Sequence, residues 1–206
     1  MTTIYLLRHG EIESDGIRRF FGQTDVRLSP TGLDQARYWR DAFSETRFGG
    51  IYASDLSRCA ETARIIAAGI SAEIHYLSEL REIHLGKLEG LAADDFRERF
   101  RDEWETRGRD IARFVPEGGE SFSGLQKRVV PVLQEICSRH EGNVLIVTHA
   151  GVNRVILCHI LGMPLSNIFR IEQSYGCLNL LESIGNSFRV IGVNLSVKDN
   201  PNKLPN

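Results

Sequence analysis

Two apolar segments of this chain end in the same way, with a histidine followed closely by a glycine. Residues 4–7 read I-Y-L-L and precede R-H-G, which contains His9; residues 144–147 read V-L-I-V and precede T-H-A-G, which contains His149. Short, continuous apolar runs are typical of strands buried in a mostly parallel sheet. Open sheets of this type place ligands at the carboxyl ends of their strands. The pattern therefore predicts an α/β fold in which both histidines lie at one edge of the sheet, provided that the strands are neighbours.

The first of these strand ends has two possible interpretations. Arg8 carries a permanent charge beside His9, whose side chain titrates near neutral pH, and Gly10 lets the backbone turn sharply. This combination is suited to chemistry on an anion. The alternative is a strand end whose arginine and histidine only reach solvent, and the R-H-G segment alone favours that alternative.

Length and composition indicate a globular protein without a broad charge bias. The 206 residues are 42% hydrophobic and 25% charged, which is ordinary for one α/β domain with a sizeable core. A formal net charge of -2 predicts no general attraction to nucleic acid or to an anionic membrane surface. Any anion-binding site must therefore be built locally from a few side chains.

Cysteine usage and hydropathy predict a cytoplasmic protein. The four cysteines include no C-x-x-C pair and no metal-ligand spacing, which is consistent with a reducing compartment. The amino terminus enters a strand directly and lacks the pattern of a signal peptide. Residues 144–163 are hydropathic, but polar residues such as Arg154 interrupt them, so we predict no membrane span.

Strands that alternate with helices predict a three-layer α/β/α sandwich with a mostly parallel sheet. Ser29 and Pro30 open a helix as N-cap and first residue, and we expect that helix to end near the glycines at 49–50. A short strand follows at residues 51–53, then a helix to about Ala68 that Gly69 stops. A third strand is expected at residues 73–77.

The second half of the chain adds a charged helical segment and a hairpin. Residues 92–114 are helical in pattern and rich in charges of both signs, which predicts a solvated cap over one end of the sheet. Ser121 or Glu120 opens a helix that runs to His140, and a hairpin turns around residues 185–186. We expect one domain over residues 1–197, with 92–116 as a cap insertion, and a flexible tail at 198–206.

A third strand end adds charge to the same edge of the sheet. Residues 52–54 lead into the start of another helix, from which Arg58 can point back toward the two histidines. The helix that follows His149 presents free N–H groups, which favour a phosphate or another anion. Two histidines and two arginines are therefore expected to converge on one oxyanion.

Five blocks of sequence, in order, resemble the histidine phosphatase superfamily, also called phosphoglycerate mutase-like. These are L-L-R-H-G-E, S-D-L-S-R-C-A-E-T-A, L-R-E-I-H-L-G-K-L-E-G, P-E-G-G-E-S and V-T-H-A-G-V, which span nearly the whole chain except its tail. The G-G-E-S block and the short chain look more like the phosphatase branch, which includes α-ribazole phosphatases. Phosphoglycerate mutases of the family tend to be longer.

The resemblance implies a role for each residue that matches the family pattern. His9 is implied to be the nucleophile that becomes phosphorylated, with Arg8, Arg58 and His149 in the phosphate pocket and Glu82 as proton donor. Attack by a histidine requires one ring nitrogen without a proton, so the other should donate to a carbonyl or carboxylate. Arginines can neutralise the transition state in place of magnesium. With no Walker A loop and no metal-spaced carboxylates, we predict no metal and no cofactor.

The loop at residues 18–25 resembles the family segment that leans over the phosphate. Gln23 and Thr24 are candidate ligand contacts, Arg18 or Arg19 can meet a second acidic group of the substrate, and Ala150 is a further candidate at the helix start. The alternative is a loop that is simply packed down by its two phenylalanines.

One position departs from the family pattern. Asp15 stands where members often carry an asparagine that helps to bind phosphate. A carboxylate there repels phosphate, so either Asp15 points away from the site or the substrate is held differently.

These observations favour a phosphomonoesterase that acts on a small phosphorylated metabolite. Two alternatives remain open: a bisphosphoglycerate-dependent phosphoglycerate mutase, and a non-catalytic phosphate-binding protein on the same fold. The expected partner is the small-molecule substrate alone, without nucleic acid or membrane, and the protein is expected to be a monomer or a homodimer.

Overall fold

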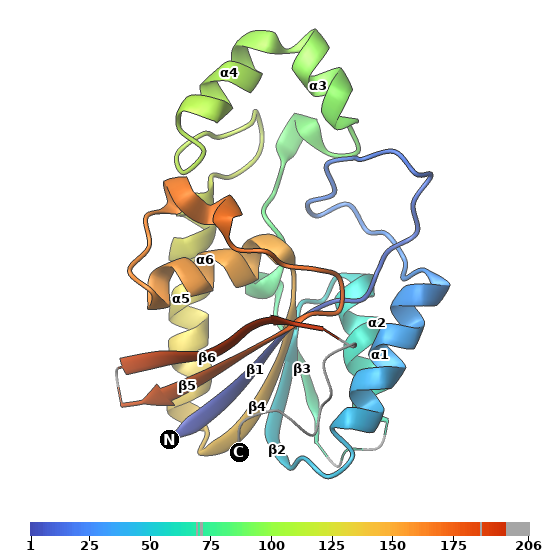
Figure 1. Ribbon diagram of the computed structural model, residues 1–206, viewed down its shortest axis with the longest axis vertical. Helices are drawn as coiled ribbons and strands as arrows, with labels where there is room; N and C mark the ends of the chain where they lie inside the picture. The colour runs from blue at the N-terminus through green and yellow to red at the C-terminus, as the bar shows by residue number, and fades with distance from the viewer. Residues whose placement is uncertain (69, 71, 186, 197–206) are drawn as a thin grey trace.

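The central sheet has the predicted α/β organisation (Figure 1). The computed structural model describes residues 1–68, 70, 72–185 and 187–196. Across this part of the chain, six strands follow the order β3-β2-β4-β1-β5-β6. The strands are β1 (Thr2–Arg8), β2 (Phe48–Ala53), β3 (Ile74–Tyr76), β4 (Gly142–Thr148), β5 (Leu178–Ile184) and β6 (Ser187–Leu195). Strands β1 to β4 pair in parallel, whereas β5 and β6 are added antiparallel at the edge.

Helices cover both faces of this sheet (Figure 1). The helices are α1 (Pro30–Ala42), α2 (Ser57–Ala67), α3 (Ala93–Arg99), α4 (Arg101–Arg109), α5 (Phe122–Arg139) and α6 (Ala150–Ile160), with short 3₁₀ turns η1 (Ser78–Leu80), η2 (Gly86–Leu88) and η3 (Leu165–Arg170). Val144 and Ile146 pack toward α5 and α6, whereas Leu145 and Val147 pack toward α1 and α2. Because alternate residues of β4 point to opposite faces and both faces are covered, residues 144–147 are all apolar.

The predicted cap at Ser29 is confirmed, and of the two candidates for the start of α5 the structure selects Ser121. The side chain of Ser29 accepts a hydrogen bond from the Gly32 amide at the start of α1, and that of Ser121 accepts one from Gly124 at the start of α5. Each hydroxyl satisfies a backbone donor that the first helical turn leaves unpaired.

The predicted end of the first helix is wrong. Helix α1 stops at Ala42, Phe43 caps it, and residues 49–50 lie inside β2. A Cβ at Gly50 would lie 2.9 Å from Cε1 of His140. The glycine therefore makes room for an approaching ring, a common meaning of glycine in a strand, and does not end a helix.

The charged segment forms two helices instead of one continuous helix. Helices α3 and α4 are separated at Phe100, and both lie beyond the carboxyl ends of the parallel strands, at the top of Figure 1. No helix in the described part of the chain is long and apolar enough to cross a membrane. The predicted tail at 198–206 and the helix stop at Gly69 lie outside the described residues.

Candidate active site

The register of β1 and β4 brings the two histidines together. Arg8 pairs with Thr148, and the His9 amide donates to the Thr148 carbonyl at 2.9 Å. The ring centroids of His9 and His149 lie 5.2 Å apart, and both side chains are buried. The prediction that the two strands are neighbours is confirmed.

Local bonding determines which nitrogen of His9 is available. Nδ1 lies 2.7 Å from the carbonyl oxygen of Gly10. A carbonyl only accepts hydrogen bonds, so Nδ1 carries the proton and Nε2 keeps its lone pair. Burial, assisted by the charges of Arg8 and Arg58, holds the pKa of His9 well below its usual 6.5. The imidazole is therefore neutral and nucleophilic at neutral pH.

Gly10 is required for a reason other than the predicted sharp turn. Its φ lies outside the left-handed region, but a Cβ at this position would stand 2.4 Å from the carbonyl oxygen of Gly32. The strand end and the first turn of α1 approach too closely for a side chain.

His149 differs from His9 because both of its ring nitrogens are occupied. Nε of Arg58 donates to Nδ1 at 3.3 Å, so Nε2 carries the proton and lies 2.9 Å from Oγ of Ser54. Burial and the nearby Arg58 lower the pKa of His149 well below its usual value. The ring is fully buried and does not line the cavity into which His9 opens. In this structure it fixes Arg58.

Arg58 is a buried cation without a carboxylate partner among the described residues. Only 1% of it is exposed. Besides its bond to His149, it donates to the carbonyls of Gly22 at 2.6 Å and Thr24 at 2.8 Å. None of the described carboxylates forms an ion pair with it. A buried charge satisfied only by neutral acceptors is costly, and an anionic ligand offsets that cost.

Arg8 provides a second positive charge beside His9. Its Nη1 donates to the carbonyl of Gln173 at 2.7 Å, and its guanidinium lies 3.7 Å from the ring centre of Tyr175. Its Nε is buried and has no hydrogen-bond partner among the described residues. A buried donor without a partner is uncommon and points to a ligand acceptor.

Glu82 reaches the site by packing against the first turn of α6. Its carboxyl oxygens accept the amides of Gly151 at 3.0 Å and Ile83 at 2.9 Å. A Cβ on residue 151 would lie 2.2 Å from one of these oxygens. The glycine of T-H-A-G therefore admits the carboxyl group, a role that sequence reasoning missed.

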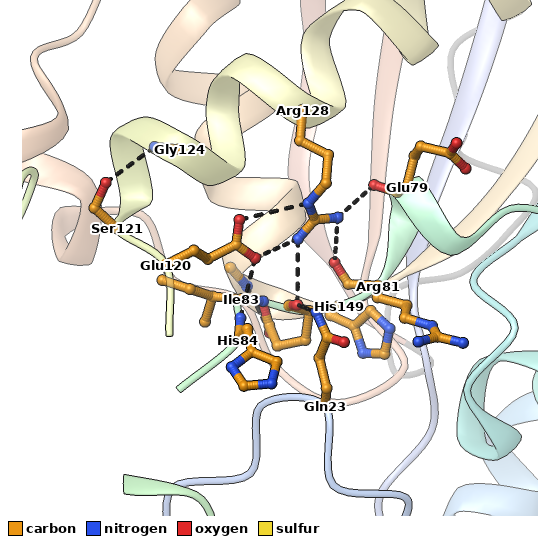
Figure 2. A network of polar contacts seen from close by, with 12 residues as sticks. Gln23, Glu79, Arg81, Ile83, His84, Glu120, Ser121, Gly124, Arg128 and His149 are labelled. Atoms are coloured by element: carbon orange, nitrogen blue, oxygen red, sulfur yellow. Dashed lines mark hydrogen bonds and ion pairs between the residues drawn. The ribbon is translucent and has the colours of Figure 1, made fainter. Parts of the chain in front are cut away.

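A second polar network holds the segment that carries Glu82 (Figure 2). Arg128 of α5 donates to the backbone carbonyls of Glu79, Arg81 and Glu82. Its guanidinium is paired with Glu120, which also accepts the amide of His84. The P-E-G-G-E-S block thus contributes an ion pair that fixes the backbone on either side of Glu82.

The cavity in front of His9 has a volume of about 300 Å³. Of the predicted site residues, Arg8, His9, Arg19, Arg58, Glu82 and Ala150 line it. Gln23 and Thr24 do not: the Gln23 amide donates to the Glu82 carbonyl, and the Thr24 hydroxyl donates to Glu89. These contacts hold the loop against the segment that carries Glu82 and Glu89.

Among the described residues, no group of three or more His, Cys, Asp or Glu side chains is arranged to hold a metal ion. The described donors of the site are arginines, histidines and backbone amides. Groups of this kind bind an anion directly.

Comparison with known proteins agrees with this geometry. The sequence profile of the histidine phosphatase superfamily, branch 1, matches residues 4–196. The chain belongs to the histidine phosphatase superfamily. Membership of this superfamily explains both the fold and the five sequence blocks that resemble it.

The similar members of the superfamily include phosphatases and a mutase-like protein. The chain is 36% identical to phosphoglycerate mutase-like protein 4 of Arabidopsis thaliana over 73% of its own length and 67% of that protein. It is 34% identical to the metal-independent phosphoserine phosphatase of Arabidopsis thaliana over 78% and 69% of the two chains. It is 28% identical to the adenosylcobalamin/alpha-ribazole phosphatase of Salmonella typhimurium over 87% and 89%.

Solved structures extend the match to the fold. The protein YhfR of Bacillus stearothermophilus superposes with a TM-score of 0.85 at 32% identity, covering 93% of this chain and 96% of that one. Together these matches support phosphatase activity for this member of the superfamily.

The unusual aspartate of this superfamily member does not line the cavity. Asp15 forms an ion pair with Arg19 at 2.7 Å and does not line the cavity. The pairing with Arg19 lowers the pKa of the Asp15 carboxyl. An Asp15 carboxylate that is paired with Arg19 and lies outside the cavity lining agrees with the first of the two predicted alternatives.

Sequence reasoning missed several residues that line the cavity. Arg107 of α4 and Arg154 of α6 bring two more positive charges, and Phe169 and Tyr175 add aromatic surface. Arg107 sits in a segment whose mixed charges suggest only a solvated helix, so no signal distinguished it. Arg154 follows His149 by five residues, and that spacing was the available clue.

Proposed function

We propose that this protein is a metal-independent phosphomonoesterase that forms a phosphohistidine intermediate on His9. One observation carries the proposal: Nε2 of His9 keeps a free lone pair beside the buried Arg58 and the partly buried Arg8, neither of which forms an ion pair with a described carboxylate. This arrangement combines a nucleophile with a binding site for a dianion.

In the first step, Nε2 of His9 attacks the phosphorus atom and the ester P–O bond breaks. Arg8 and Arg58 hold the phosphoryl oxygens and neutralise the spread negative charge of the transition state. His149 keeps the Arg58 guanidinium in place through its bond to Nε. A direct contact between His149 and the phosphoryl group requires its Nε2–H to leave Ser54.

Glu82 acts first as a general acid and then as a general base. In its protonated form it gives that proton to the departing alkoxide oxygen, so the alcohol leaves neutral. It then takes a proton from the water that attacks phosphorus, the P–N bond of phospho-His9 breaks, and inorganic phosphate leaves. Both His9 and Glu82 line the same cavity.

The size of the cavity and the similar proteins support a small substrate. A volume of about 300 Å³ is at the low end of the roughly 300–1,000 Å³ of ligand sites. Similar proteins carry the names alpha-ribazole phosphatase and phosphoserine phosphatase, and we extend to this chain only the class of small phosphorylated metabolites. A cytoplasmic location and a monomeric or homodimeric state remain predictions.

The test is hydrolysis of p-nitrophenyl phosphate in excess chelator by the wild type and by His9→Asn. We expect turnover by the wild type alone, together with acid-labile, base-stable phosphate labelling that the variant lacks. Absence of hydrolysis for every phosphomonoester tried would contradict the proposal and favour a non-catalytic phosphate-binding protein.

A mutase is the second candidate, because a similar protein is named phosphoglycerate mutase-like. Phosphoglycerate is incubated with and without bisphosphoglycerate, and isomerisation is compared with phosphate release. Isomerisation faster than release would replace the phosphatase with the mutase.

A further inference from the structure

The cavity in front of His9 contains more positive charge than a phosphoryl group requires. Arg8 and Arg58 lie beside the nucleophile and match the charge of a phosphate dianion. Three further arginines without an ion pair among the described residues also line the cavity: Arg18, Arg107 and Arg154. Arg19 lines it too, but Asp15 already neutralises this residue. The lining includes a single carboxyl group, that of Glu82.

Arg107 is the most constrained of the surplus cations. Its guanidinium lies 5.8 Å from the ring centre of Phe20 and 5.7 Å from that of Phe169, so it is held between the loop and η3. Burial and the nearby charge of Arg18 lower its pKa. Two cations that repel each other in a partly buried site are unfavourable until an anion joins them.

Other cations of the same region are either paired or exposed to solvent. Arg101 is paired with Glu105 within α4, and Lys87 is paired with Glu103 of the same helix. Arg109, two residues beyond Arg107, is exposed to solvent. On α4, therefore, Arg107 combines partial burial with the lack of an ion pair among the described residues, whereas Arg101 is paired and Arg109 is exposed.

We propose that Arg107 and Arg18 form a second anion subsite that binds a carboxylate on the leaving group of the substrate. This inference rests on the proposed phosphatase function and specifies its substrate class. A carboxylate matches the planar guanidinium, and Phe20 and Phe169 flank it with apolar surface. The cavity of about 300 Å³ must hold the phosphoryl group as well, which favours a carboxylate over a second phosphate.

The test uses pairs of aryl phosphates that differ only in charge. Carboxyphenyl phosphate and its neutral isostere carbamoylphenyl phosphate, in meta and para forms, are hydrolysed by the wild type, Arg107→Met, and the matched control Arg109→Met. We expect the wild type and Arg109→Met to prefer the acid over the amide in kcat/KM by about ten-fold or more in at least one pair. In Arg107→Met, kcat/KM should fall more on the acid than on the amide, so that the preference approaches unity.

The outcomes separate this inference from the proposed function. Equal kcat/KM for acid and amide in the wild type would overturn the subsite while leaving the phosphatase intact. An equal loss on both esters in Arg107→Met would also overturn it, because the arginine would then support the fold and not the carboxylate. Thermal unfolding of each variant checks folding, and Arg107→Lys should keep part of the preference.

Discussion

The ends of β1 and β4 look alike in the sequence and behave differently in the structure. Each strand end carries a histidine. The two rings lie side by side, and burial lowers the pKa of both. Of the two, His9 alone has a ring nitrogen without a hydrogen-bond partner among the described residues, because its other nitrogen donates to a backbone carbonyl. In His149, one ring nitrogen is hydrogen-bonded to Arg58 and the other to Ser54. Hydrogen-bond saturation, and not residue type, separates a nucleophile from a positioning group.

The largest effect should come from exchanging each histidine for asparagine. His9→Asn removes the attacking atom and should lower kcat by about 10⁴-fold or more. His149→Asn leaves the nucleophile but loosens Arg58, and a loss of roughly 10²–10³-fold is expected, as for other transition-state donors. Steady-state rates on one aryl phosphate measure both. Equal losses, or phosphate labelling at His149, would break the distinction between the two histidines.

Glu82→Gln tests whether His9 acts independently of the proton donor. For alkyl phosphates, whose leaving group needs a proton, we expect kcat to fall by about 10²–10⁴-fold. For p-nitrophenyl phosphate the first step should survive, so stopped-flow traces should show a burst of nitrophenolate followed by slow turnover. Uniform losses without a burst would assign Glu82 a purely structural role.

Glu120→Gln tests the network in Figure 2. Removing the charge that pairs with Arg128 should misplace the Glu82 segment and lower kcat about ten-fold, with the larger loss on alkyl esters. Glu117→Gln is the matched control, because Glu117 belongs to the same block and is 82% exposed. The measurement is kcat of each variant on an alkyl phosphate and on an aryl phosphate. If the two esters lose activity equally, Glu120 does not act through Glu82.

Because the pKa values of the two histidines are lowered in the folded protein, the free energy of unfolding should depend on pH. Folding keeps both rings neutral, whereas the unfolded chain takes up protons near pH 6.5. Stability is therefore complete above this pH and falls as pH decreases toward the folded-state pKa values, by up to about 1.4 kcal/mol per pH unit for each ring.

Denaturant titrations between pH 7.5 and 5 measure this loss. His9→Asn should flatten the dependence, whereas His159→Asn, at an exposed position of α6, should leave it unchanged. Nitrogen-detected NMR at pH 6 should show one protonated nitrogen on each ring. A dependence that both variants share with the wild type would contradict the assignment.

Some features of this protein were predictable because they depend on neighbouring residues. Apolar runs that end in R-H-G and T-H-A-G predicted β1 and β4, and the serine caps of α1 and α5 follow from bonds within one helical turn. The end of α1 was not predictable in this way. The glycine at position 50 serves a contact with His140, which is 90 residues away.

The sequence by itself therefore determined the class of fold and which chemical groups meet at the edge of the sheet, because strand patterning is local. Only the tertiary structure decided which histidine keeps a free lone pair, why Gly151 admits Glu82, and that Arg107 faces the same cavity. These properties depend on hydrogen bonds and close approaches between segments far apart in the chain. Such contacts leave no periodic trace in the residues on either side.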